Sequence, residues 1–109
     1  MKRNKYRAIP TVVDGIRFAS KAEARHYGEL KILEAAGDIK DLELQPEYPI
    51  IVNGIRVAIY RADFRFMGRT KHGYIQMIVD VKGMATPVYK LKKKLVEAIY
   101  EITISEVKA

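Results

Sequence analysis

Asp80 and Lys82 stand two residues apart in the apolar run from residue 74 to residue 82. Side chains of a strand alternate between its two faces, so these two point the same way and Val81 points to the other face. An apolar strand that exposes a carboxylate and an ammonium group side by side at its C-terminal end is unusual, and this makes the pair a candidate site. The same pair also fits an ion pair on a solvated strand edge.

Asp63 is a second candidate acid, set between the apolar residues Ala62 and Phe64. If its segment pairs with residues 74–82, Asp63 approaches Asp80 closely. Two neighbouring carboxylates repel each other unless a cation lies between them. Mg²⁺ suits such a pair, because it binds few carboxylates and fills its other positions with water and phosphate oxygens. Taken alone, Asp63 is better interpreted as a surface aspartate of a hairpin.

Glu23 is the third acid and has two interpretations. It completes a capping box with Ser20, which is a purely structural role. It also shares the helical spacing of Tyr27, Leu30 and Glu34, which puts it at the edge of an inward-facing stripe. A glutamate at this position can cap the helix and still face the sheet, so both interpretations remain open.

The elements that would hold these residues follow from turn and cap signals. Asp14-Gly15 and Asn53-Gly54 predict hairpins, Ser20 and Thr86-Pro87 predict helix starts, and Gly37 predicts a helix end. The expected elements are a hairpin at 11–18, a helix at 20–36, strands at 42–52, 55–67 and 74–82, a second helix after 86, and a strand at 102–107. Val88, Leu91, Leu95 and Ala98 keep helical spacing along the second helix.

The order helix, strand, strand, strand, helix, strand predicts an α/β sandwich with a mixed sheet. The last strand is expected to return beside an earlier one by a right-handed crossover. A length of 109 residues suits a single domain over residues 1–109, with a basic arm at about residues 1–10.

Composition narrows the function. The net charge of +7 favours a polyanionic partner, nucleic acid first. The absence of cysteine excludes disulfides, cysteine-based zinc sites and thiol nucleophiles. The basic start leads into no apolar segment and no run approaches the roughly 20 residues of a membrane span, so we expect a cytoplasmic protein.

At this point the chain resembles the PD-(D/E)XK nuclease superfamily, and within it small phage-borne endonucleases that include Holliday junction resolvases. The likeness runs over most of the chain, from about residue 4 to residue 107. The segments that carry it are residues 18–24, 44–46, 62–66, 80–83 and 91–95. The superfamily's proline before the first aspartate is replaced by Ala62.

The resemblance implies a restriction-endonuclease-like sandwich and a DNA endonuclease that uses Mg²⁺, with Mn²⁺ as a substitute, in a bacterial or phage-infected cell. Asp63 and Asp80 would bind the metal, with the Val81 carbonyl as a further ligand. Glu23 would complete the metal shell directly or through water. Lys82 would orient the attacking water or stabilise the pentacovalent phosphate.

Contacts to DNA are expected from basic residues around this site. Lys90, Lys93 and Lys94 share one face of the second helix with Glu97, opposite Leu91, Leu95 and Ala98. Further candidates are Lys5 and Arg7 in the basic arm, Arg65, Arg69, Lys71, and Gln45. Gln45 would hold water or a phosphate, or else is a polar residue of an edge strand. Phosphate contacts of this kind position the backbone without reading sequence.

Two classes of function remain open. The first is the nuclease, acting on branched DNA or on nicks, single-stranded ends or a specific duplex site. Cutting two strands with one site per chain would require a homodimer. The alternative is a basic nucleic-acid-binding module without catalysis, whose acids serve as caps and ion pairs. Three carboxylates facing one point would favour the nuclease.

Overall fold

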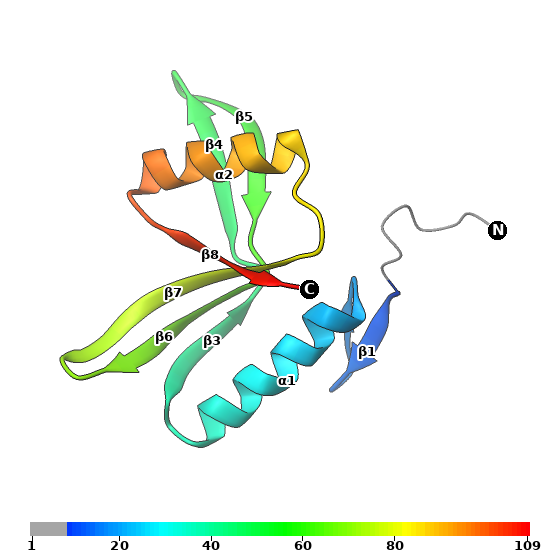
Figure 1. Cartoon of the computed structure of the whole chain (residues 1–109). Coiled ribbons are helices and arrows are strands. Elements are labelled where there is room, and N and C mark those ends of the chain that lie inside the picture. Colours follow the sequence, from blue (N-terminus) through cyan, green and yellow to red (C-terminus); the bar gives the residue numbers. More distant parts are fainter. Residues whose placement is uncertain (1–8) are drawn as a thin grey trace.

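The computed structural model describes residues 9–109, which contain two helices and eight strands (Figure 1). The helices are α1 (Lys21–Ala35) and α2 (Pro87–Tyr100). The strands are β1 (Thr11–Val13), β2 (Ile16–Phe18), β3 (Ile39–Leu44), β4 (Glu47–Val52), β5 (Ile55–Arg61), β6 (Phe64–Thr70), β7 (Gly73–Lys82) and β8 (Ile104–Lys108). Neither helix is long and apolar enough to cross a membrane. Lys5 and Arg7 lie outside the described residues.

A mixed four-stranded sheet forms the centre, in the order β3-β6-β7-β8. The first three strands pair antiparallel, and β8 returns parallel to β7 after the α2 crossover. The predicted α/β class with a mixed sheet is therefore confirmed. Two separate hairpins, β1–β2 and β4–β5, complete the structure.

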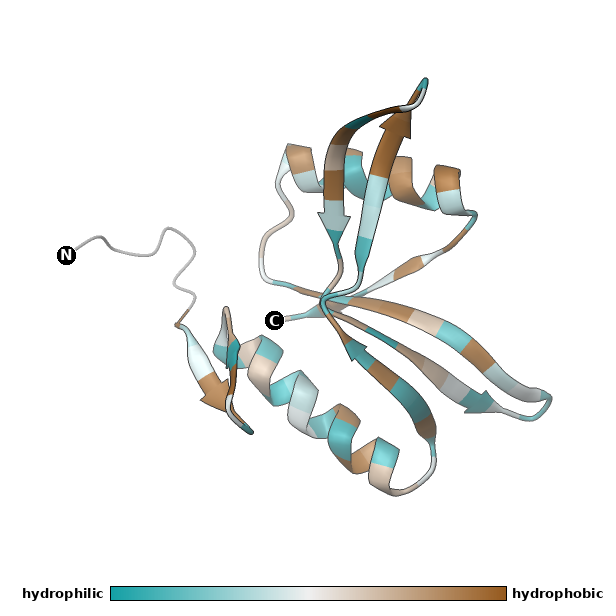
Figure 2. Ribbon diagram, turned by 180° about the vertical axis from the view of Figure 1, so that it is seen from behind, coloured by the Kyte–Doolittle hydropathy of each residue, from teal (hydrophilic) through white to brown (hydrophobic). Residues whose placement is uncertain are grey.

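The two faces of the sheet carry two hydrophobic clusters. α1 and the β1–β2 hairpin cover one face, where Tyr27 and Leu30 pack with Phe64 and Val79. α2 and the β4–β5 hairpin cover the other, where Val96 packs with Ile78, Ile104, Tyr48, Ile50 and Tyr60. Neighbours on β7 alternate between the clusters because strand side chains alternate in direction. Figure 2 shows both helices set against the strands, with the hairpin β4–β5 rising beyond α2.

The predicted helix ends are confirmed. The Ser20 and Thr86 side chains accept hydrogen bonds from the N–H groups of Glu23 and Tyr89, both at 3.1 Å. Gly37 has φ +81° and follows the C-cap of α1. Its N–H donates to the Glu34 carbonyl at 3.1 Å, which closes a left-handed helix end that glycine enters without steric cost.

The two long strands expected around Asn53-Gly54 each break in two. β3 and β4 are separated at residues 45–46, and β5 and β6 at residues 62–63. Gln45 has φ +51°, and Pro46 has no N–H to donate to a ladder. Backbone bonds from Gln45 to Asp63 and from Ala62 to Pro46 hold the breaks together. At these breaks the β3–β4 segment and the β5–β6 segment each pass from one hydrophobic cluster to the other. The breaks depend on contacts between distant segments, so the sequence pattern does not reveal them.

The expected inward face of α2 is wrong. Val96 is the buried residue of α2 and Tyr89 is half-buried, whereas Val88, Leu91 and Leu95 are exposed. The helix is turned because residues on its other side bind β8. Lys93 pairs with Glu106 at 3.1 Å, and the Glu97 carboxylate accepts from the Ile104 N–H at 2.8 Å.

Candidate active site at the bend of two strands

Asp63 lies in the break between β5 and β6, beside the end of β7. The Asp63 N–H donates to the Asp80 carboxylate at 3.0 Å, and the Asp63 carboxylate accepts from the Val81 N–H at 2.7 Å. The second bond takes the place of a ladder bond, because the main chain turns away at Ala62 to join β5. Asp63 is thus hydrogen-bonded to both Asp80 and Val81 of β7, and the predicted proximity of Asp63 to Asp80 is confirmed.

Asp80 is fully buried on the α2 face of the sheet, a difference from the exposed carboxylate expected at the end of this strand. One of its oxygens accepts from Asp63, and the other has no hydrogen-bond partner. Burial raises the pKa of Asp80, opposed by the nearby charge of Lys82. A buried carboxylate oxygen without a partner is costly, on the order of 1–3 kcal/mol or more for a charged group.

Glu23 approaches the same bend from α1. Its side chain is buried, and loss of solvation together with the charge of Asp63 raises its pKa to about 7. Lys82 opposes this rise, and Asp80 adds to it more weakly. Glu23 thus lies in the first turn of α1, where its N–H donates to the Ser20 side chain, and its carboxyl group lies within range of the charge of Asp63.

Lys82 is the electrostatic partner that the three acids share. Its charge lowers the pKa of Glu23, Asp63 and Asp80, against the burial that raises each one. Its ammonium nitrogen lies 4.4 Å from the centroid of the Tyr89 ring, which fixes the lysine at the start of α2.

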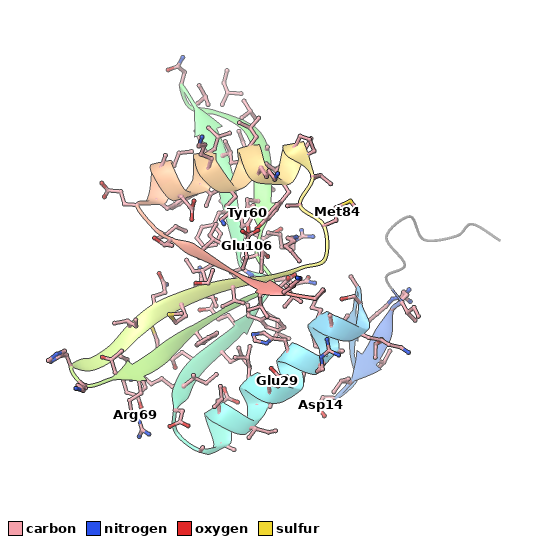
Figure 3. All side chains as sticks on the ribbon, in the orientation of Figure 1. Asp14, Glu29, Tyr60, Arg69, Met84 and Glu106 are labelled. Atoms are coloured by element: carbon pink, nitrogen blue, oxygen red, sulfur yellow. The ribbon has the colours of Figure 1, made fainter. Side chains whose placement is uncertain are left out.

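Two contributors were missed by sequence reasoning. The Tyr89 hydroxyl donates to Glu106 at 2.9 Å, and Glu106 lies opposite Asp80 in the β7–β8 register. Burial and this hydrogen bond raise the pKa of Tyr89, so the ring stays neutral beneath Lys82. Figure 3 places Glu106 between α2 and the sheet. Glu106 reaches the site because β8 pairs parallel to β7, and no local pattern in the sequence predicts that pairing.

His26 is also closer to the site than an isolated surface histidine would be. It is half-buried on α1, its ring centroid lies 5.6 Å from that of Phe64, and its charge lowers the pKa of Asp63, which burial raises. Its other contact is Glu29 at 3.3 Å. The helical offset of three residues from Glu23 is the signal that would have placed His26 near the site.

The structure thus joins Asp63 to Asp80 by one hydrogen bond and brings Glu23 and Lys82 within range of their charges. Within residues 9–109, no group of three His, Cys, Asp or Glu side chains stands ready to hold a metal ion. Glu23 and Asp80 reach the bend from opposite faces of the sheet, which separates them.

The expected DNA contacts divide into three sets. Lys90, Lys93 and Lys94 line a hollow of about 430 Å³ along α2, although Lys93 is engaged by Glu106. Arg65 pairs with Glu43, and Arg69 pairs with Asp38 at the far end of the sheet (Figure 3). Gln45 is exposed and its N–H donates to the Asp63 carbonyl at 2.9 Å, so it borders the site.

Comparison with known proteins gives one family. No curated protein and no solved structure matches the chain. The profile of one family matches residues 3–108, which is nearly the whole chain. The chain belongs to the family described as "Protein of unknown function (DUF1064)".

Proposed function

We propose that this protein is a metal-dependent endonuclease that hydrolyses phosphodiester bonds of DNA, with a restriction-endonuclease-like arrangement of the kind that the sequence resembles. The observation that carries the proposal is the bend at Asp63. There, a buried Asp80 with one unpartnered oxygen stands beside a second aspartate and a fixed lysine. A module that only binds DNA has no use for a carboxylate buried at this cost.

The donor set fits Mg²⁺ or Mn²⁺. Mg²⁺ needs one or two carboxylates and keeps several waters, so Asp63 and Asp80 suffice without a third acid. The unpartnered oxygen of Asp80 is free to bind a cation, and a cation there would offset the cost of burial, which raises the pKa values of both aspartates. A bound divalent cation would supply a more acidic water and neutralise phosphate charge.

The protein's own groups have distinct tasks under this proposal. Lys82, held over Tyr89, places a positive charge where the phosphorane would develop negative charge. Glu23, with a pKa of about 7, exchanges a proton near neutral pH and suits a general base for water. The exposed Lys90 and Lys94 would hold the phosphate backbone along α2.

The test is cleavage of end-labelled four-way, flap, nicked and linear DNA with Mg²⁺, Mn²⁺, Ca²⁺ or excess chelator. We expect cutting with Mg²⁺ and Mn²⁺, and binding without cutting with Ca²⁺, whose looser shell misplaces the water. Branched DNA is the first substrate class to compare. Equal cutting in chelator would refute the metal mechanism.

Asp80→Asn is the matched variant, since an amide oxygen still accepts from the Asp63 N–H while the charge is lost. It should bind DNA and fail to cut, with an unchanged circular dichroism spectrum. If wild type and Asp80→Asn both bind DNA with equal affinity and neither cuts any substrate, the non-catalytic binding module is the better description.

A further inference from the structure

α2 carries an apolar stripe that the fold leaves uncovered. Val88, Leu91, Leu95 and Ile99 follow one another at intervals of three, four and four residues, so they share one side of the helix. Their exposed fractions lie between 37% and 63%. The opposite side is occupied, because Val96 is buried and Lys93 and Glu97 bind β8.

The β4–β5 hairpin continues this surface. Ile50 is buried in the cluster that α2 covers, and alternation along β4 assigns Val52 to the same face, just past the register shift between Ile50 and Ile51. Val52 pairs with Ile55, so both tip residues face the side on which α2 lies. They are 51% and 65% exposed, because the hairpin crosses α2 and extends past it in both views (Figures 1 and 2).

Together these residues form an exposed apolar surface, which we name the α2–hairpin surface: Val88, Leu91, Leu95, Ile99, Val52 and Ile55. Six aliphatic side chains that are about half exposed offer on the order of 500 Å² of apolar area, comparable to the largest apolar patch of a typical monomer, which often serves in binding. A stable homodimer needs roughly 800 Å² from each partner, of which about two-thirds is apolar. The surface therefore matches the apolar core of one such interface.

We propose that the α2–hairpin surface binds the same surface of a second copy of this chain across a two-fold axis. An apolar stripe is complementary to itself, and a two-fold axis sets α2 against α2 with each hairpin tip beside the partner's helix. Charge permits this pairing despite the net +7, because the stripe holds no charged residue, and Lys90 and Lys93 lie toward Glu106. That the dimer would supply one catalytic site for each DNA strand rests on the proposed function. The dimer interface itself is inferred from the exposed apolar residues and does not depend on that function.

The mass of the full-length protein in solution tests the interface. Sedimentation or light scattering of wild type should give about twice 12.5 kDa. Leu91→Glu and Leu95→Glu should each return the mass to 12.5 kDa, since burying an unpaired charge is strongly unfavourable. The matched control is Ile32→Glu on α1, where an isoleucine that is 71% exposed lies away from this surface, and this variant should remain dimeric.

Cysteine cross-linking locates the contact between the two copies even if the glutamate variants fail to fold. The chain has no cysteine, so a single introduced thiol can pair only with its counterpart in another copy. Among Val88→Cys, Leu91→Cys, Leu95→Cys and Ile99→Cys, the position nearest the two-fold axis should give a disulfide-linked dimer under mild oxidation. Ile32→Cys should not.

Three outcomes would overturn the inference: a monomeric wild type at the highest attainable concentration, a dimer that Leu91→Glu and Leu95→Glu leave intact, or cross-linking at Ile32 alone. Flotation of a monomeric wild type with anionic lipid vesicles, lost in Leu91→Glu, would assign the surface to lipid instead. A dimer that cuts no DNA would refute the nuclease and keep this interface. A protein that cuts DNA as a monomer would refute this interface and keep the proposed nuclease function.

Discussion

Glu23→Gln should stabilise the metal-free protein at alkaline pH and leave its stability nearly unchanged in acid. The folded protein holds the Glu23 proton more tightly than the unfolded chain, with a pKa of about 7 against 4.5. Stability therefore falls as the pH rises from 4.5 to 7, because the unfolded state releases this proton first. The difference corresponds to about 3 kcal/mol at about 1.4 kcal/mol per pKa unit. Glutamine keeps the shape and removes the charge, so most of this cost should be regained above pH 7.

The assay is urea unfolding of wild type and Glu23→Gln in chelator, at several values between pH 4 and pH 9. Above pH 7 the variant should be more stable by roughly 2–3 kcal/mol, and below pH 4.5 the two curves should converge. Glu101→Gln, an exposed carboxylate that caps α2, is the control and should change stability by less than about 0.5 kcal/mol throughout. A gain that is equal at pH 4 and pH 9 would refute the reasoning, because the cost would then not be one of charge.

Further predictions concern catalysis and the core. Lys82→Ala should lower single-turnover cleavage by on the order of 10²-fold with little loss of affinity, because under the proposed function its charge would act at the reacting phosphate. Lys94→Ala should weaken binding, reduce its salt slope by about one and spare turnover at saturating DNA. Lys94 is chosen over Lys93 because Lys93 is paired with Glu106. Normal cutting by saturated Lys82→Ala would make Lys82 a phosphate clamp. Tyr89→Phe should keep turnover within a few-fold of wild type, whereas Tyr89→Leu should lose it, because the aromatic ring holds the Lys82 ammonium group. If both variants lose the same amount of turnover and have the same thermal stability, the ring has no such role. Phe64→Ala should cost about 3–5 kcal/mol by denaturant unfolding, since this side chain is fully buried, and a cost under 1 kcal/mol would show that the core repacks.

The local features of this protein were predictable because short-range physics determines them. Ser20, Gly37 and Thr86-Pro87 mark helix ends through bonds to residues three or four positions away. Asn53-Gly54 adopts positive φ at both residues and turns the hairpin as predicted. The apolar residues Ala62 and Phe64 on either side of Asp63 are both buried, although the bend places them in different clusters.

The orientation of α2 was not predictable in the same way. Its sequence holds two apolar sides, one with Val88, Leu91 and Leu95 and the other with Tyr89 and Val96. Either satisfies a helical period. The second side faces the sheet because Glu97 and Glu106 are placed to bind there only after β8 has paired with β7.

The helix ends, the two Asx-Gly turns and the shared direction of Asp80 and Lys82 could be predicted from the sequence, because they depend on neighbours within a few positions. The tertiary structure alone decided the bend at Asp63, the complete burial of Asp80 and the arrival of Tyr89 and Glu106. The bend, the burial of Asp80 and the positions of Tyr89 and Glu106 all depend on how segments far apart in the chain pack into the two hydrophobic clusters. The arrangement of lowest free energy depends on packing across the whole sheet, which no local pattern records.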